Sequence, residues 1–378
     1  MEKEIKLSNG NIIPVMGFGT WELTGETGVE AIIEAIKCGY RHIDTAQAYN
    51  NEEEVGKAVN HCINEGIVKR EDLYISSKLN FFKPIGYKNT IKAVYESLEK
   101  LKLDYIDTYL IHWPNLTIDD SWKYLNASTW KALEDLHKQG LIKNIGVSNF
   151  MIHHLEELLK TAEIKPVVNQ LNLNPQWQQK EVVKFCFDND ILPVAWSANV
   201  KIENWNREIL TSLAQKYNVS TNQLCYRYGL QKGWSVLARS KNPEHIKSNF
   251  DIMNFEISAE DMAKLDNLNS HPSMHIQHPD VMFGVYSYIE RLNSYETIRK
   301  EKFLLFGFIP LLSCKPAHSK GFAGSRTDFL NSIPIFRTKV KDTNNIKVYL
   351  FSFIPIGKIE SKIYTTKFEA IPKYEGRN

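Results

Sequence analysis

Four ionisable side chains in the first third of the chain are placed where they could carry out proton transfer. Asp44, Lys78 and His112 each end a short apolar run, and Tyr49 lies in the loop that follows Asp44. A phenol is a weak acid with a pKa of about 10, and a nearby ammonium lowers that value. Lys78 can supply the ammonium if a carboxylate such as Asp44 holds it in place.

An imidazole near this group can orient a substrate oxygen by hydrogen bonding, which is the role that we assign to His112. The set suits protonation of a carbonyl oxygen as a hydride reaches the carbonyl carbon. This chemistry needs no metal, and the sequence contains no H-E-x-x-H or other compact metal-ligand pattern. We therefore expect a metal-free proton-transfer site built from adjacent strand ends.

Short apolar runs alternate with helix-like stretches over the first 270 residues, and this pattern predicts how the four side chains are positioned. Eight strands alternating with helices predict a parallel sheet closed into a (β/α)8 TIM barrel, whose strand ends carry the chemistry. A doubly wound open sheet is the alternative, but no G-x-G-x-x-G opens a helix after the first strand. An Asn9-Gly10 turn between residues 5–7 and 12–14 predicts an N-terminal β-hairpin. The predicted strands are 15–19, 41–44, 73–78, 105–112, 142–148, 167–171, 191–197 and 235–240, and the clearest helices 31–39, 89–101, 130–140 and 181–188.

Composition excludes several classes of protein. Of the 378 residues, 43% are apolar and 24% are charged, which is typical of a globular chain. We find no apolar run long enough to span a membrane and no apolar core of a signal peptide. The net charge of +2 argues against nucleic acid as a partner, and the five cysteines form no zinc or disulfide pattern. A reducing cytoplasm is the expected location.

The last part of the chain differs from the rest. Residues 271–378 carry 16 Lys and Arg against 9 Asp and Glu, and the pattern of alternating strands and helices stops there. We therefore predict two domains, 1–270 and 271–378. The second contains a repeated L-F-x-F-I-P element, at 302–311 and again at 347–356.

The repeat predicts either a pair of strands or a hydrophobic clasp on the barrel. Because Lys and Arg flank its aromatic runs, contact with a membrane surface or another partner is a second interpretation. The repeat also resembles tail elements of some bacterial surface-polysaccharide enzymes, which implies a bacterial origin and a sugar-related pathway.

Several motifs resemble those of the aldo-keto reductases, in the bacterial short-loop form. The segment G-Y-R-H-I-D-T-A-Q-A-Y-N-N-E-E-E-V-G (39–56) is similar to the family's first signature. Further similarities are K-L (78–79), I-H-W-P (111–114), G-V-S-N-F (146–150), V-N-Q-L-N-L-N-P (168–175) and A-W-S (195–197). The resemblance covers about residues 5–268 and implies a TIM barrel that binds NADPH without a Rossmann fold. Its catalytic tetrad corresponds to Asp44, Tyr49, Lys78 and His112, with Tyr49 as the general acid.

The resemblance also implies a set of cofactor-binding residues. Ser148, Asn149 and Gln170 match residues that bind the nicotinamide carboxamide, and Trp196 matches the aromatic residue that stacks on its ring. Arg239 stands where the family usually has a Lys that binds the 2′-phosphate, and its guanidinium can bind phosphate. NADPH is the expected cofactor, with NADH as the alternative. The remaining implied contacts are Gly19, Thr20, Asp44, Ser197, Ser240 and Asn249.

Trp21 and Trp113 match aromatic residues of the family's substrate pocket, where Tyr49 and His112 would also touch the substrate. We therefore expect an NADPH-dependent reductase that converts aldehydes or ketones, including sugar-derived ones, to alcohols. The alternative is a barrel that binds NADPH as a sensor or scaffold with little turnover.

Overall fold

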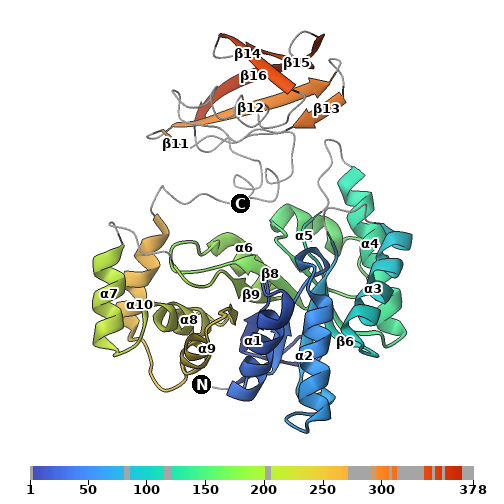
Figure 1. The fold of residues 1–378 in the computed structure, drawn as a ribbon. Coiled ribbons are helices and arrows are strands. Elements are labelled where there is room, and N and C mark those ends of the chain that lie inside the picture. The colour runs from blue at the N-terminus through green and yellow to red at the C-terminus, as the bar shows by residue number, and fades with distance from the viewer. Residues whose placement is uncertain are drawn as a thin grey trace. The chain divides into compact units, whose positions relative to one another are not determined.

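The computed structural model contains a closed barrel and a separate antiparallel sheet (Figure 1). The structure describes residues 3–80, 86–114, 121–200 and 206–270, and, beyond them, the strand segments 291–292, 295–305, 309–312, 336–342, 345–350 and 354–367. The chain divides into two compact units, one containing the barrel and the other containing these later strands.

The barrel consists of eight parallel strands, each hydrogen-bonded to its neighbours in the order β10-β3-β4-β5-β6-β7-β8-β9. This confirms the predicted TIM barrel and excludes the open doubly wound sheet. Both faces of the strands are buried, which is why they read as continuous apolar runs in the sequence. The strands are β3 (Met16–Gly19), β4 (His42–Asp44), β5 (Tyr74–Lys78), β6 (Ile106–Ile111), β7 (Ile142–Ser148), β8 (Val168–Asn172), β9 (Leu192–Trp196) and β10 (Ser235–Ala238).

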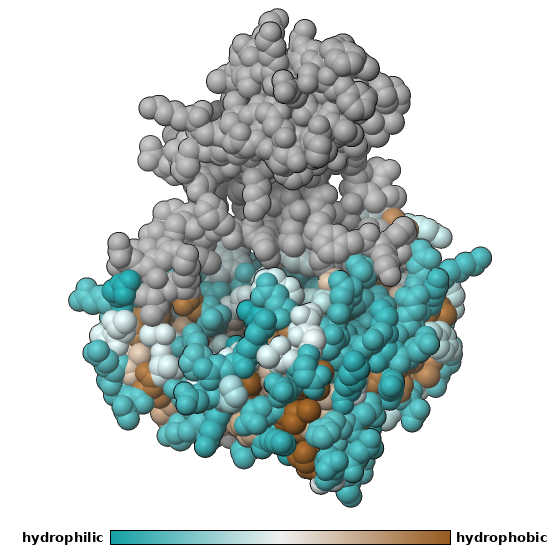
Figure 2. Space-filling model, viewed as in Figure 1, coloured by the Kyte–Doolittle hydropathy of each residue, from teal (hydrophilic) through white to brown (hydrophobic). Residues whose placement is uncertain are grey.

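Amphipathic helices surround the barrel and bury one face against the strands (Figure 1). All four helices predicted from periodicity are present, although the observed helices begin earlier. The outward side of the barrel is largely hydrophilic in the view of Figure 2. The described helices are α1 (Gly25–Cys38), α2 (Glu52–Asn64), α3 (Tyr87–Leu101), α4 (Ser121–Lys138), α5 (Ile152–Leu159), α6 (Lys180–Asp188), α7 (Arg207–Lys216), α8 (Thr221–Gln231), α9 (Pro243–Phe250) and α10 (Ala259–Asp266), with single turns η1 (Gln47–Tyr49), η2 (Arg70–Asp72) and η3 (Asn267–Ser270).

The predicted N-terminal hairpin is present as β1 (Glu4–Lys6) and β2 (Ile12–Pro14). Its buried residues Leu7 and Ile13 belong to the same apolar cluster as strand residues such as Leu110 and Leu237. The side chain of Asn9 also donates to Asn144 of β7, at 2.8 Å. The hairpin therefore closes the amino-terminal end of the barrel and leaves the carboxyl ends of the strands for the site.

The second unit contains an antiparallel sheet with the strand order β11-β12-β16-β15-β14, in which β13 also pairs with β12. The repeated element lies in two strand pairs with matching register: Leu304 opposes Pro310, and Tyr349 opposes Pro355. Residues 306–308 and 351–353, within the two copies, lie outside the described residues. The strands are β11 (Arg291–Leu292), β12 (Tyr295–Leu305), β13 (Ile309–Leu312), β14 (Phe336–Asp342), β15 (Asn345–Leu350) and β16 (Ile354–Lys367).

Candidate active site

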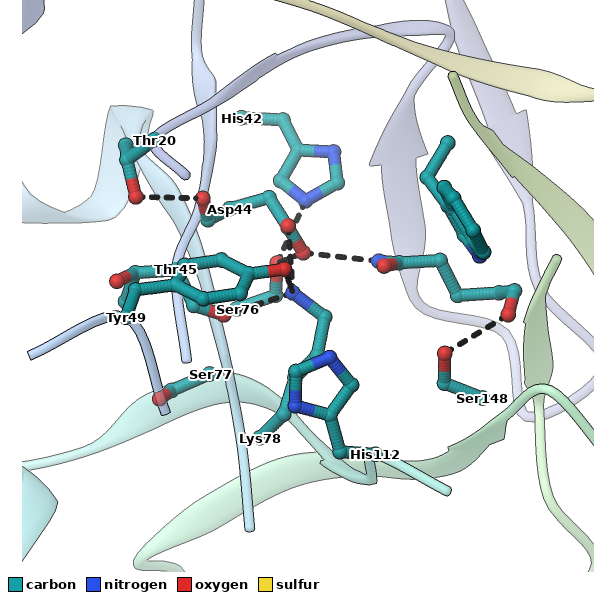
Figure 3. Close-up of polar contacts among 12 residues, drawn as sticks. Thr20, His42, Asp44, Thr45, Tyr49, Ser76, Ser77, Lys78, His112 and Ser148 are labelled. Carbon is teal, nitrogen blue, oxygen red and sulfur yellow. Dashed lines mark hydrogen bonds and ion pairs between the residues drawn. The ribbon is translucent and has the colours of Figure 1, made fainter. Parts of the chain in front are cut away.

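The structure brings the predicted catalytic residues together at the carboxyl ends of three neighbouring strands (Figure 3). Asp44 is the last residue of β4, Lys78 is the last residue of β5, and His112 directly follows β6. Tyr49 ends the short turn η1 that follows β4. Because parallel strands end at one rim of a barrel, residues distant in sequence meet there.

A buried ion pair between Lys78 and Asp44 forms the centre of the site. The Lys78 Nζ lies 2.6 Å from Asp44 Oδ2, and the two side chains are 0% and 4% exposed. Nζ also donates to the carbonyl of Thr45 at 2.8 Å and to the Tyr49 hydroxyl oxygen at 3.4 Å. Burial lowers the pKa of Lys78, but Asp44 and Tyr49 together raise it by more, so the pKa lies above its ordinary value. Lys78 is therefore an ammonium aimed at the phenol.

Burial raises the pKa of Tyr49 more than the Lys78 charge lowers it. The sequence-based expectation was correct about the effect of the ammonium but wrong about the net direction, because a strand-end pattern does not show how deeply a loop residue is buried. A raised pKa keeps the phenol protonated at neutral pH, as a proton donor requires.

His112 lies beside the phenol, with ring centroids 5.6 Å apart and the planes at 77°. Burial, and then the Lys78 charge, lower its pKa well below the ordinary value. The imidazole is therefore neutral at physiological pH. A neutral ring can donate one N–H to a substrate oxygen without adding a charge.

Asp44 also connects this group to the residues expected to bind nicotinamide. Its Oδ1 accepts from Ser76 Oγ and from Gln170 Nε2, both at 2.8 Å. The hydroxyl of Ser148 donates to the backbone carbonyl of Gln170 at 2.8 Å, and Asn149 Nδ2 donates to the Ser148 hydroxyl at 3.0 Å. One hydrogen-bonded network thus joins Tyr49 to the residues predicted to bind the carboxamide.

The donor set of this network fits a nicotinamide amide. No hydrogen bond to the Gln170 Oε1 is found within the described residues, which leaves an acceptor for a carboxamide NH₂. The Trp196 indole N–H donates to Asn149 Oδ1 at 3.1 Å, which fixes the orientation of a ring that is only partly buried. A fixed, partly exposed aromatic face is suited to stacking on a nicotinamide ring.

Gly19 and Thr20, at the end of β3, adjoin the same carboxylate residue. Gly19 pairs with Asp44 in the sheet, and the Thr20 hydroxyl donates to the Asp44 carbonyl at 2.9 Å. Both residues therefore position the Asp44 backbone.

The residues expected to bind cofactor phosphates are, apart from Asn249, more exposed than the tetrad. Ser197 is exposed and has a left-handed backbone, with φ 50°. Arg239 directly follows β10 and is engaged by Glu22, whose Oε2 lies 2.9 Å from Nη1. Ser240 accepts from the backbone N–H of Asn242 at 3.0 Å, whereas Asn249 of α9 is buried.

The two tryptophans expected in the substrate pocket differ in exposure. The side chain of Trp21 is 55% exposed, and its ring lies 5.3 Å from the guanidinium carbon of Arg239. Trp113 is only 5% exposed and directly follows His112. Trp113 is thus largely buried, while Trp21 lies beside Arg239, the residue expected to bind the 2′-phosphate.

Sequence reasoning missed three polar residues that hold the site. Ser76 lies two positions before Lys78 on β5, so strand alternation could have placed it on the same face. Its Oγ donates to Asp44 and therefore accepts the Nε2–H of buried His42, at 2.9 Å. Asn51 donates to the carbonyls of Thr20 and Leu23, at 2.7 and 2.8 Å, and no local pattern predicts that role.

Comparisons with known proteins agree with this architecture. The profile of the Aldo/keto reductase family matches residues 15–201 and 202–270. A glyoxal reductase of Bacillus subtilis is 45% identical over 270 residues, covering 71% of this chain and 94% of the relative. The methylglyoxal reductase DkgA of Escherichia coli strain K12 is 38% identical over 267 residues, covering 70% and 93%.

Solved structures are similar over the same region. An aldo/keto reductase from Brucella melitensis has 41% identity and a TM-score of 0.65, and the match covers 70% of this chain and 98% of that one. An aldo-keto reductase from Bombyx mori, solved in complex with NADP, has 33% identity and a TM-score of 0.65, covering 72% and 95%. With the barrel, the strand-end tetrad and these matches in agreement, the chain belongs to the aldo/keto reductase family.

Proposed function

We propose that the protein reduces aldehydes or ketones to alcohols with NADPH, using Tyr49 as the proton donor. The observation that carries this proposal is the Tyr49 hydroxyl lying 3.4 Å from a Lys78 ammonium that is ion-paired with Asp44. NADPH would supply the hydride to the carbonyl carbon. The carbonyl oxygen takes the Tyr49 proton, and Lys78 stabilises the phenolate that this transfer leaves. Neutral His112 orients the oxygen by hydrogen bonding.

Residues on two sides of the tetrad would hold the cofactor. Gln170, Ser148 and Asn149 offer polar atoms for the carboxamide, and Trp196 offers an aromatic face. The exposed Arg239 offers a guanidinium for the 2′-phosphate, with Ser240 and Asn249 as further contacts. NADH is the alternative cofactor because it makes every contact except those to the 2′-phosphate.

The sensor or scaffold interpretation is less well supported than turnover. A binding protein needs neither a buried ammonium beside a phenol nor a neutral imidazole next to both. Here the ammonium is fully buried, and the desolvation cost of burying a charge is offset only by its partners, so a catalytic role would account for its presence. The complete donor arrangement therefore favours catalysis.

We propose small aldehydes with an adjacent carbonyl as the first substrates to test, with sugar-derived carbonyls next. The names of the Bacillus and Escherichia relatives, a glyoxal reductase and a methylglyoxal reductase, support this class. The exposed indole of Trp21 supplies an apolar surface near the rim.

The test is oxidation of NADPH, followed by absorbance, with glyoxal, methylglyoxal and open-chain sugars. Tyr49→Phe removes the proton and should lower kcat by about 10²–10⁴-fold while leaving NADPH affinity nearly unchanged. Tyr124→Phe, on the 74% exposed Tyr124 of α4, is the matched control and should behave as wild type. Full activity in Tyr49→Phe would refute the assignment of Tyr49 as the general acid. NADPH binding without reduction of any carbonyl would favour the sensor interpretation.

We further propose that residues 1–270 form the reductase domain of a cytoplasmic, bacterial enzyme and that 271–378 form a separate extension. The family match ends at residue 270, and the strands beyond it form their own compact unit. Relatives from Bacillus and Escherichia support the bacterial origin. Within the described residues, no helix is long and apolar enough to cross a membrane.

For the extension we propose contact with an anionic membrane surface. The sheet register places Lys339 opposite Lys347, and Lys347 opposite Lys358. Residues 271–378 also carry 16 Lys and Arg against 9 Asp and Glu, and this excess of positive charge supports an anionic partner. Co-sedimentation of the full chain with anionic vesicles, but not with neutral ones, is the expected result. Loss of binding when these three lysines become glutamine would support the proposal, and equal binding to neutral vesicles would refute it.

A further inference from the structure

Arg239, the residue proposed to bind the cofactor 2′-phosphate, already has an anionic partner on the chain. Its Nη1 donates to Glu22 Oε2 at 2.9 Å and to the Trp21 carbonyl at 2.8 Å. Its guanidinium carbon also lies 5.3 Å from the Trp21 ring centroid. All three contacts come from the segment directly after β3, so they connect the first strand to the last strand of the barrel.

The backbone of Glu22 contributes to this arrangement. Glu22 has φ 61°, in the left-handed region that residues with a Cβ rarely adopt. This turn follows Trp21 directly, and both the Trp21 carbonyl and the Glu22 carboxylate reach one guanidinium nitrogen. A glycine would make the same turn without steric cost, but it would supply no carboxylate.

We propose that Glu22 sets the preference of the protein between NADPH and NADH by competing with the 2′-phosphate for Arg239. The inference rests on the proposed function, in which Arg239 binds that phosphate. A guanidinium binds carboxylates and phosphates through the same donors, so the phosphate must displace Glu22 or share Arg239 with it. NADH carries no 2′-phosphate, and its binding leaves the pair of Glu22 and Arg239 intact.

The exposure of the pair sets the size of this effect. The side chains of Arg239 and Glu22 are 39% and 54% exposed, so solvent and salt screen their attraction. The competition therefore weakens NADPH binding without preventing it. Removing the carboxylate frees the Arg239 guanidinium to bind the phosphate. We expect NADPH to bind about 2- to 10-fold more tightly when the carboxylate is gone, from the usual strength of exposed ion pairs.

The experiment compares the dissociation constants of NADPH and NADH by calorimetry in the full chain. Glu22→Gln keeps the shape of the side chain and removes its charge. The expected result is about 2- to 10-fold tighter NADPH binding and unchanged NADH binding. Glu26→Gln is the matched control, because Glu26 is exposed in the first turn of α1 and forms no ion pair with the residues that the structure describes. It should change neither constant.

Arg239→Gln tests whether Glu22 acts through Arg239. In that background, adding Glu22→Gln should leave NADPH affinity unchanged, because the shared guanidinium is gone. Equal tightening in both backgrounds would show that Glu22 repels the cofactor directly and would overturn the proposal. Equal tightening of NADPH and NADH would also overturn it, because the effect would not involve the 2′-phosphate. Wild-type protein that binds neither dinucleotide would refute the proposed function itself, whereas normal NADPH binding that Glu22→Gln leaves unchanged would refute only this inference.

Discussion

Replacing Asp44 alone should destabilise the barrel more than replacing Asp44 and Lys78 together. The Lys78 side chain is 0% exposed, and its charge lies 2.6 Å from Asp44 Oδ2. Asp44→Asn leaves a buried ammonium facing an amide, the Thr45 carbonyl and the Tyr49 hydroxyl. Asp44→Asn with Lys78→Met removes both charges and keeps a side chain of similar length.

The expected magnitude comes from the burial of the pair. Removing one partner of a buried ion pair typically costs about 3–5 kcal/mol, whereas replacing both with neutral groups is often close to neutral. The free energy of unfolding of the double variant should therefore be higher than that of Asp44→Asn by at least about 2 kcal/mol. Both variants should lose activity, because neither keeps a charged Lys78 held beside Tyr49.

The pH dependence gives an independent check. In the wild type the pKa of Lys78 is raised above its ordinary value, because Asp44 and Tyr49 outweigh the lowering caused by burial. This contribution to stability is present below about pH 10 and is lost only as the pH rises through the folded-state pKa. In Asp44→Asn, burial acts without the carboxylate, so the pKa of Lys78 falls below its ordinary value.

The unfolded state of Asp44→Asn then binds more protons than its folded state, so the free energy of unfolding of this variant rises with pH. The slope is up to about 1.4 kcal/mol per pH unit wherever Lys78 is neutral in the folded state and charged in the unfolded state. The deficit of Asp44→Asn relative to wild type should therefore shrink between about pH 7 and pH 9. The double variant lacks the lysine and should keep a constant difference.

Urea unfolding followed by tryptophan fluorescence is a suitable assay. All eight tryptophans precede residue 270, so the signal reports on the barrel and not on the extension. Equal stability of the single and double variants would refute the reasoning, because Lys78 would then carry no uncompensated charge. A deficit of Asp44→Asn that does not change with pH would refute it as well.

Three other changes test separate parts of the barrel. Gly56→Ala should lower the free energy of unfolding in urea by about 1–3 kcal/mol, since a Cβ there would lie 2.6 Å from the Leu101 carbonyl oxygen, a backbone atom. An unchanged urea midpoint would show that α2 and α3 move apart easily. Asn51→Ala should lower stability by about 1–3 kcal/mol, because its amide donates to two backbone carbonyls and accepts from the Thr45 hydroxyl; wild-type stability would mean that water replaces these bonds. Because the pKa of His112 is well below its ordinary value, the pH profile of kcat/KM should show no inflection near about pH 6.5. An inflection at that pH that His112→Gln removes would show that the imidazole titrates there.

The barrel and the convergence of the four polar residues could be predicted because both depend on local pattern and one general rule. Apolar runs mark strands that are buried on both faces, and parallel strands end at the same rim. Asp44 and Lys78 are the last residues of their observed strands, where the sequence placed the ends of the apolar runs. Counting strands therefore located the residues without any knowledge of their contacts.

Contacts between distant polar residues could not be predicted in the same way. Glu22 and Arg239 are 217 positions apart, and their pairing depends on a left-handed turn that no glycine marks. The pKa of Tyr49 is raised because burial outweighs the opposing effect of the Lys78 charge. The burial of Trp113 likewise results from packing and not from its position in the I-H-W-P motif. Each of these properties arises in three dimensions from parts of the chain that carry no shared sequence signal.

The two oxygens of Asp44 explain why proton transfer and cofactor binding should depend on each other. Oδ2 holds the Lys78 ammonium, which faces the Tyr49 hydroxyl, while Oδ1 accepts from Ser76 and from Gln170. Because Gln170 is also proposed to meet the nicotinamide amide, a cofactor that reorients its side chain changes the hydrogen bonding of the carboxylate that anchors Lys78. Loss of the bond from Gln170 would leave more negative charge on Asp44 for Lys78, and less of the Lys78 charge would then act on Tyr49. Under the proposed cofactor contact, the acidity of the phenol would respond to the cofactor through Gln170, and an apolar residue of the same size could not replace this amide.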